Sequence, residues 1–285
     1  MIKNILVRST GKPGDAIAHE LALQAARLFK AHLKFLHVQV DPKELIIATA
    51  SVEYGGSALM NETIERSRQE SNADAKSAKA AFAAFCTARR IQVASVPDGK
   101  VVSAEWVREI GSSADWVSRH GMVADLVVLT RPGEGMDETA VLEAGLFNTG
   151  RPLLIAPTVP SKTSLETVVI AWEESAPAAR AVDAAMPFLE KAQRVIILVI
   201  GEKSADNGVK RLVAALRWHG VEAEVQQQKP GKSGAADTML AAATKNGAGL
   251  IVMGGYGHSP TREWVFGGFT ERVLKDAELP VLMAH

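Results

Sequence analysis

The chain contains the stretch Ile251-Val-Met-Gly-Gly-Tyr-Gly-His-Ser-Pro-Thr-Arg-Glu-Trp-Val-Phe-Gly-Gly-Phe-Thr-Glu-Arg-Val-Leu274. An apolar strand leads into a glycine-punctuated loop, and a second glycine pair opens an amphipathic helix. A helix that starts here leaves the amides of Gly268, Phe269 and Thr270 without intrahelical partners, with the positive end of the helix dipole behind them. These features are typical of a phosphate site. The glycine spacing matches neither the P-loop nor the GxGxxG fingerprint.

The rest of the second half predicts a sheet with its ligands at one edge. Apolar runs predict strands near 167–172, 194–200, 221–227, 249–253 and 279–284, and helices are expected over 176–189, 205–219, 234–246 and 269–276. Continuous Val/Ile/Leu strands that alternate with helices indicate a parallel sheet covered on both faces. Ligands bind such sheets beyond the carboxyl ends of the strands, where the strand order reverses. Glu173 and Gly254 are therefore expected to face one crevice.

The first half repeats this pattern. Equivalent positions in the first, fourth and fifth strands lie 163, 124 and 128 residues apart, namely Val7 and Ile170, Ala124 and Ala248, and Pro152 and Pro280. The first half therefore has extra residues before its fourth strand, and they fall around 41–90. There a polar loop leads into a long helix rich in Ala, Lys and Glu. The first half is also shorter in the loop that carries the glycines in the second half.

The repeat predicts the domain organisation. We expect an α/β fold of two tandem Rossmann-like domains, each a five-stranded parallel sheet with helices on both faces. The domains should span 1–157, with the insert near 41–90, and 165–285. Between them, residues 157–163 have the proline and hydroxyl content of a linker.

Composition narrows the class of protein. Lys plus Arg and Asp plus Glu are equal at 32 each, which argues against nucleic acid as the main partner. The single cysteine, Cys86, lies beside Phe82 and Phe85 and is expected to be a small buried apolar residue. A lone cysteine also fits a reducing compartment. No apolar run approaches the roughly 18 residues of a membrane helix, so we expect a cytoplasmic protein without membrane contact.

At these residues the chain resembles the universal stress protein family, in a tandem form whose domains are of the adenine nucleotide alpha hydrolase type. The family's binding pattern is a glycine, two residues, a glycine, nine residues, then a glycine followed by serine or threonine. Gly254, Gly257 and Gly267 match this pattern, whereas Gly268 stands where serine or threonine is usual. The resemblance covers the whole chain twice, but only the second half carries the motif.

The resemblance implies that the second half binds an adenine nucleotide: ATP, or else ADP or AMP. It places an acidic residue, Glu173, near the ribose and a Mg²⁺ ion, and the adenine against Val199. The implied nucleotide-binding positions are Ala171, Trp172, Glu173, Val199, Met253, Gly254, Gly257, His258, Gly267, Gly268, Phe269 and Thr270. In the first half Thr10 stands in the place of Glu173, so that half is expected to be degenerate.

The family also pairs its domains through their last strands. Residues 152–156 and 280–284 should then meet antiparallel within one chain and form an intramolecular pseudo-dimer, and two chains could dimerise further. The sequence leaves the oligomeric state open.

Plainer explanations exist for each candidate residue. The glycines could serve tight turns and helix caps, and Glu173 could simply charge the start of the following helix. His258 and Arg262 are either phosphate contacts or solvated loop charges, and Trp264 with Phe266 is expected to hold the loop to the domain.

The function expected is therefore regulatory nucleotide binding with at most slow hydrolysis, because the sequence offers no obvious water-positioning base beyond Glu173. The alternative is a nucleotide-free scaffold that binds a protein partner.

Overall fold

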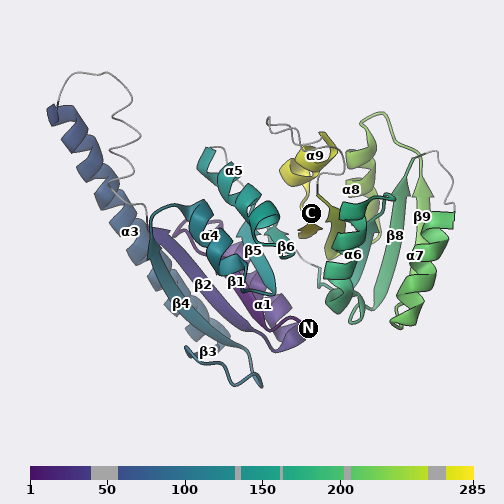
Figure 1. Cartoon of the computed structure of the whole chain (residues 1–285), viewed down its shortest axis with the longest axis horizontal. Coiled ribbons are helices and arrows are strands. Elements are labelled where there is room, and N and C mark those ends of the chain that lie inside the picture. The colour runs from purple at the N-terminus through teal and green to yellow at the C-terminus, as the bar shows by residue number, and fades with distance from the viewer. Residues whose placement is uncertain (40–56, 132–135, 161–162, 202–206, 256–267) are drawn as a thin grey trace.

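The computed structural model describes residues 1–39, 57–131, 136–160, 163–201, 207–255 and 268–285. Its strands form one continuous eleven-stranded sheet in the order β3-β4-β2-β1-β5-β6-β11-β10-β7-β8-β9. All neighbouring pairs are parallel except β6 and β11, where the two halves of the chain meet. Figure 1 shows the two half-sheets side by side, with helices packed against them.

The first half holds six strands. Its elements are β1 (Asn4–Arg8), α1 (Asp15–Phe29), β2 (His32–Gln39), α3 (Ser57–Arg89), β3 (Gln92–Val93), β4 (Ser103–Ile110), α4 (Ser113–Gly121), β5 (Leu126–Thr130), α5 (Met136–Glu143), the π-helical turn η1 (Ala144–Asn148) and β6 (Leu153–Ala156). Five of the strands are those the sequence predicts. The sixth, β3, is a two-residue edge strand that pairs with β4 as the chain returns from α3.

The second half repeats the five-stranded pattern. Its elements are β7 (Thr167–Ala171), α6 (Ala176–Leu189), β8 (Arg194–Ile200), α7 (Asn207–Trp218), β9 (Ala223–Gln228), α8 (Ala235–Lys245), β10 (Leu250–Gly254), α9 (Gly268–Asp276) and β11 (Val281–Ala284). The sequence predictions for these elements are confirmed to within two residues at nearly every boundary.

Two apolar cores cover the two faces of the sheet. On one face α1, α3, α6 and α7 pack in a single cluster, and on the other α4, α5, η1, α8 and α9 form the second. The central strands, such as β1, β5, β6, β10 and β11, are almost completely buried, as expected for a parallel sheet with helices on both sides, whereas the edge strands β3 and β9 are more exposed. The predicted α/β fold with two tandem units is therefore confirmed.

The seam between the halves is apolar and antiparallel. Leu154 pairs with Leu282 at the centre of the β6–β11 contact. The antiparallel pairing of the last strands is thus as predicted from the resemblance. Phe29 of α1 and Phe188 of α6 meet across the seam in a T-shaped contact with centroids 5.0 Å apart. Because the cores continue across the seam, the halves pack as one body.

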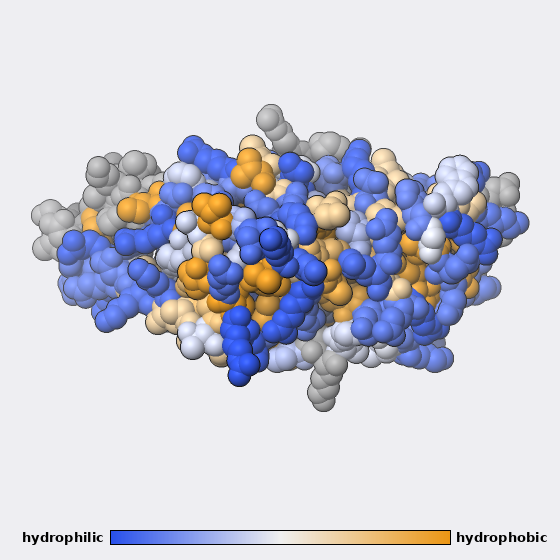
Figure 2. Space-filling view, turned by 90° about the horizontal axis from the view of Figure 1, so that it is seen from below, coloured by the Kyte–Doolittle hydropathy of each residue, from blue (hydrophilic) through white to orange (hydrophobic). Residues whose placement is uncertain are grey.

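The long helix expected in the first-half insert is α3, and Figure 1 shows it extending beyond the sheet. Cys86 on this helix is 3% exposed, as predicted. The predicted loop before α3 lies mostly outside the described residues. Seen from below (Figure 2), apolar residues gather mainly toward the middle of the molecule. No helix in the described part of the chain is both long and apolar enough to cross a membrane.

Candidate functional site

The strand order of the second half creates a crevice between β10 and β7. The chain runs from β7 outward through β8 to β9, then returns to β10 on the other side of β7. Ala171 at the end of β7 lies beside Met253 of β10, so the loops that follow these two strands leave the sheet together. This reversal is where ligands bind in open α/β sheets, and it brings Glu173 and Gly254 to one edge as predicted.

Gly254 lies very close to the start of α6. A Cβ atom on Gly254 would lie 2.5 Å from the nitrogen of Ala178 and 2.7 Å from the carbonyl carbon of Pro177. Both are backbone atoms, which cannot rotate away. Packing alone therefore requires a glycine here, so this glycine is explained without any ligand.

Gly268 is different. It begins α9, it is exposed, and no heavy atom of the described residues lies within 4 Å of the place where its Cβ would be. Helix starts leave backbone N–H groups free for an anion, and Gly268 leaves this one sterically open. The first turn also carries Glu271, whose charge competes with a phosphate.

The next two residues of α9 contribute differently. Phe269 packs against the second core, and Thr270 is 6% exposed. Their side chains therefore anchor the helix, and only their amides remain for a ligand.

Glu173 lies in the turn between β7 and α6. Its side chain is exposed, and its Oε1 accepts a hydrogen bond from the hydroxyl of Ser175 at 3.1 Å. Ser175 in turn caps α6 by accepting the amide of Ala178. This arrangement fits the plainer explanation for Glu173, and it also leaves the carboxylate at the crevice.

The neighbouring Glu174 is used elsewhere, because it pairs with Arg211 of α7 at 2.5 Å. Among the described residues, no group of three or more His, Cys, Asp or Glu side chains could hold a metal ion. Glu173 could thus supply only one ligand to a Mg²⁺ ion.

The remaining positions form the floor and one wall of the crevice. Trp172 continues the β7–β8 ladder by donating its amide to the carbonyl of Leu198 at 2.9 Å. Trp172 and Val199 are half-buried and pack on the first core, whereas Met253 is buried in the second. Gly257, His258 and Gly267 lie outside the described residues, as do Arg262, Trp264 and Phe266.

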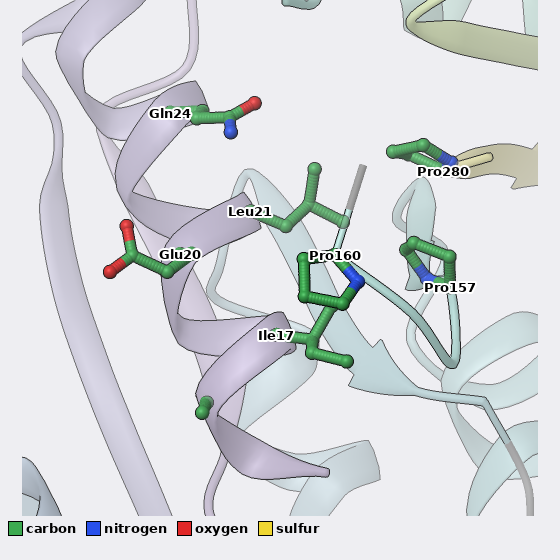
Figure 3. A pocket seen from close by; sticks show the side chains of 8 residues that line it. Ile17, Glu20, Leu21, Gln24, Pro157, Pro160 and Pro280 are labelled. Atoms are coloured by element: carbon green, nitrogen blue, oxygen red, sulfur yellow. The ribbon is translucent and has the colours of Figure 1, made fainter. Parts of the chain in front are cut away.

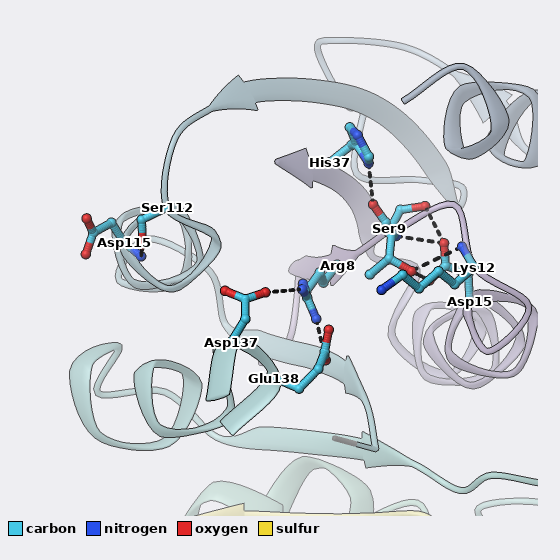
Figure 4. Close-up of polar contacts among 10 residues, drawn as sticks. Arg8, Ser9, Lys12, Asp15, His37, Ser112, Asp115, Asp137 and Glu138 are labelled. Carbon is cyan, nitrogen blue, oxygen red and sulfur yellow. Dashed lines mark hydrogen bonds and ion pairs between the residues drawn. The ribbon is translucent and has the colours of Figure 1, made fainter. Parts of the chain in front are cut away.

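The equivalent crevice of the first half contains the chain's own charges (Figure 4). Arg8 stands at the end of β1, where the second half has Ala171. Its guanidinium is nearly buried and pairs with Glu138 at 2.7 Å and Asp137 at 3.6 Å, both in the first turn of α5. Carboxylates thus stand at the helix start where a phosphate would need free amides. These internal charges agree with the prediction that the first half lacks a nucleotide site.

The loop after β1 is closed in a similar way. Asp15 accepts hydrogen bonds from the amides of Thr10 at 2.7 Å and Gly11 at 2.8 Å, and from the hydroxyls of Ser9 and Thr10. The backbone amides of this loop therefore already donate to the carboxylate of Asp15 and are not available to a bound anion.

The first half has a histidine, His37, at the position that corresponds to Val199. The amide of Ser9 donates to Leu36 as Trp172 donates to Leu198, so His37 is the equivalent of Val199. The His37 ring is buried, bonds to the carbonyl of Ser9 at 2.8 Å, and stacks on Trp106 with centroids 5.8 Å apart. The first half therefore has a buried, hydrogen-bonded ring at the position where the second half has the aliphatic side chain of Val199.

A separate cavity lies away from these residues (Figure 3). It has a volume of about 320 Å³ and lies between α1 and three prolines near the seam, and its lining residues are Ala16, Ile17, Glu20, Leu21, Gln24, Pro157, Pro160 and Pro280. Its one charged group, Glu20, is anionic and already pairs with Arg89. This cavity is therefore unsuited to a phosphate and contains none of the predicted site residues.

The comparisons with known proteins agree with this geometry. Residues 164–285 match the model of the universal stress protein family. The chain is similar to a universal stress protein from Archaeoglobus fulgidus, with a TM-score of 0.70 and 15% identity over 99% of this chain and 98% of that one. It is also similar to a functionally unknown protein from Pseudomonas aeruginosa, with a TM-score of 0.54 and 15% identity over 99% of this chain and 92% of that one. No curated protein sequence matches the chain.

The fold is thus that of a tandem universal stress protein. Residues 164–285 belong to the universal stress protein family, and the resemblance read from the glycines is confirmed.

The sequence reasoning missed Arg8, Asp15 and Arg131. A signal existed for Arg8, since an arginine at the end of an otherwise apolar buried strand needs anionic partners. Asp15 follows a glycine at a helix start, which is a common place for a capping carboxylate. Arg131 gave no signal, because its partners lie in the other half of the chain.

Proposed function

We propose that the second half, residues 165–285, is a nucleotide-binding domain that takes an adenine nucleotide into the crevice between β7 and β10. Residues 1–157 would form a companion domain without a nucleotide. The observation that carries this proposal is the open start of α9 at the reversal of strand order, in the half that belongs to the family. ATP, with ADP and AMP as further candidates, has the phosphates such a helix start attracts.

The described residues fit such a ligand. The half-buried Val199 and Trp172 offer an apolar wall to a base, and the exposed carboxylate of Glu173 stands beside the crevice for a ribose. Gly268 leaves space for a phosphate at the amides of α9. A Mg²⁺ ion usually takes one or two carboxylates together with phosphates and water, so Glu173 would suffice as its protein ligand. The ion would neutralise phosphate charge near Glu271.

The output of this site would be regulatory. Phosphoryl transfer to water needs a group that orients the water as well as phosphate ligands. Glu173 is the one candidate among the described residues at the crevice, and the hydroxyl of Ser175 already donates to it. We therefore expect binding and release to shift the conformation or partner affinity of the loop and α9, with hydrolysis slow or absent.

One observation favours the alternative, a nucleotide-free scaffold. In the first half, Arg8 pairs with Glu138, and Asp15 accepts the amide of Thr10, so charged groups of the chain satisfy one another there without a ligand. A protein with no affinity for nucleotides at either site would then act through its surface on a protein partner.

Substitutions at Gly268 separate the two functions. No heavy atom of the described residues lies within 4 Å of a Cβ at this position, so three side chains can be compared there. Gly268→Asp would place a carboxylate at the helix start, where it stabilises the helix but repels phosphate. Gly268→Ser would restore the hydroxyl of the family pattern, and Gly268→Ala controls for the loss of glycine. Isothermal titration calorimetry with ATP and Mg²⁺ measures the affinity of each.

We expect Gly268→Asp to weaken ATP at least tenfold while unfolding at the same or a higher temperature. Gly268→Ser should bind ATP more tightly than the natural chain, and Gly268→Ala about equally. If the natural chain shows no heat of binding at millimolar ATP, the scaffold function is favoured. Equal affinity of the serine and aspartate variants would show that any nucleotide binds elsewhere.

A further inference from the structure

One side chain of the first half holds the end of α9 in the second half. Arg131 follows directly after β5, and its Nη1 donates to the carbonyl oxygen of Lys275 at 2.9 Å. Its Nη2 donates to the carbonyl oxygen of Ala277. These carbonyls lie at the carboxyl end of α9, where backbone acceptors lack intrahelical donors. A guanidinium from one half thus caps a helix of the other.

The charges at this contact are complementary. The carboxyl end of a helix carries partial negative charge, and the carboxylates of Asp276 and Glu278 add to it. Burial lowers the pKa of Arg131, and these two carboxylates act in the opposite direction. Arginine remains charged under such conditions, so the cap is electrostatic as well as geometric.

The first half also contacts the chain where it leaves β10. Gly255 is buried against η1, and a Cβ on it would lie 3.1 Å from a methyl carbon of Leu146 and 3.2 Å from that of Met283. The carbonyl of Gly255 accepts a hydrogen bond from the His285 ring at 3.1 Å, and that ring meets Phe147 edge to face. The segment between β10 and the end of α9 is therefore held at both of its described ends by the first half.

The helix between these contacts is short. It has nine residues, fewer than the 12–15 at which isolated helices become even marginally stable. Its other anchors are Phe269 and Thr270 in the first turn, the buried Val273 and Leu274, and the pairing of Arg272 with Asp237 of α8 at 2.9 Å. A rigid helix of about 14 Å transmits a displacement of its carboxyl end to its amino end. Capping by Arg131 therefore contributes to the direction in which the amides of the first turn of α9 point.

We infer that Arg131 is a positioning residue for the nucleotide site, through which the first half holds α9 so that its amino end faces the crevice. This inference rests on the proposed function. It gives the first half a role in binding although its own crevice contains internal charges. A change at Arg131 would affect the binding of the phosphates, because in the proposed site α9 would contact the phosphates and the end of β8 would contact the adenine.

The test compares Arg131→Gln with the natural chain by calorimetry, using ATP with Mg²⁺ and, separately, adenosine. The matched control is Arg151→Gln. Arg151 also lies in the first half and donates to a carbonyl at a helix end, that of Met122, at 3.0 Å, but it does not touch α9. Arg131→Lys keeps the positive charge but cannot donate to both carbonyl oxygens through a planar guanidinium. Thermal unfolding reports whether each variant is folded.

We expect Arg131→Gln to weaken ATP about tenfold, or about 1.4 kcal/mol, and to leave adenosine unchanged. Arg131→Lys should lose about threefold and Arg151→Gln nothing. The inference is overturned if Arg131→Gln binds ATP like the natural chain, or if it loses ATP and adenosine equally. If Arg131→Gln does not fold, a lysine variant with natural ATP affinity overturns it. Failure of the natural chain to bind ATP overturns the proposed function itself, a result distinct from the others.

Discussion

Replacing Gly254 with alanine should destabilise the protein, although the change adds only one methyl group. The new Cβ would lie 2.5 Å from the nitrogen of Ala178 and 3.0 Å from its Cα, whereas carbon atoms in contact prefer about 3.5–4.0 Å. Overpacking costs about 1–3 kcal/mol when side chains can adjust. Here the neighbour is backbone at the start of α6, whose shift would disturb the buried face of that helix. We therefore expect a loss of about 3 kcal/mol.

Thermal unfolding followed by circular dichroism measures this loss. For a chain of 285 residues that unfolds as one body, about 3 kcal/mol corresponds to a fall of about 5 °C in Tm. The control is Gly268→Ala, which meets no described atom within 4 Å and gains helix propensity, so its Tm should be unchanged or slightly higher. If both variants unfold at the temperature of the natural chain, the close approach of β10 to α6 is not as described, and Gly254 would have to be explained by a ligand.

Two further predictions concern buried groups. Burial raises the pKa of Cys86 to about 11, and the thiolate is the reactive form of cysteine. At pH 8 an aromatic disulfide reagent should therefore react with Cys86 about a hundredfold more slowly in the folded protein than in urea-unfolded protein. Equal rates would contradict the burial of Cys86. Burial also lowers the pKa of His19 below its ordinary value of 6.5, against the raising effect of Asp15 and Glu20. The unfolded chain then binds more protons than the folded one as pH falls below about 6.5, so stability should fall with acidification. His19→Leu should flatten this dependence in urea titrations between pH 7.5 and 5.5, and an unchanged slope would exclude His19 as its source.

Much of the second half could be predicted because its signals are local. Strands such as 250–254 are apolar throughout, and the helices between them have polar outer faces, so the element order followed directly. The glycine pattern predicted the family correctly. The pattern could not distinguish a glycine required by packing, such as Gly254, from one that leaves space for a ligand, such as Gly268. Gly254 is required because Pro177 and Ala178, which are distant in the sequence, lie against it. Spacing alone carries no information about such a contact.

Contacts between the halves could not be predicted for a related reason. The bonds from Arg131 to Lys275 and Ala277 join residues more than 140 positions apart. They exist because β6 and β11 pair antiparallel and bring the end of β5 near the end of α9. The pairing itself was expected from the family, but which side chains it brings together depends on the register and on the start of each helix.

The difference between the two crevices comes from the length of one loop and the charge at one strand end. In the first half α5 begins six residues after Thr130, and in the second α9 begins fourteen residues after Gly254. The shorter connection brings the acidic first turn of α5 to the sheet edge, where Arg8 neutralises it.

In the second half Ala171 replaces Arg8, the helix starts with Gly268, and no internal cation or carboxylate pair occupies the same place among the described residues. A buried ion pair is costly to break, so the first crevice cannot readily exchange its internal charges for a ligand. In the described part of the second half, Ala171 at the equivalent strand end forms no such pair. On the proposed function, this asymmetry predicts one nucleotide for each chain, bound by the second half, and a ratio of two per chain in calorimetry would contradict it.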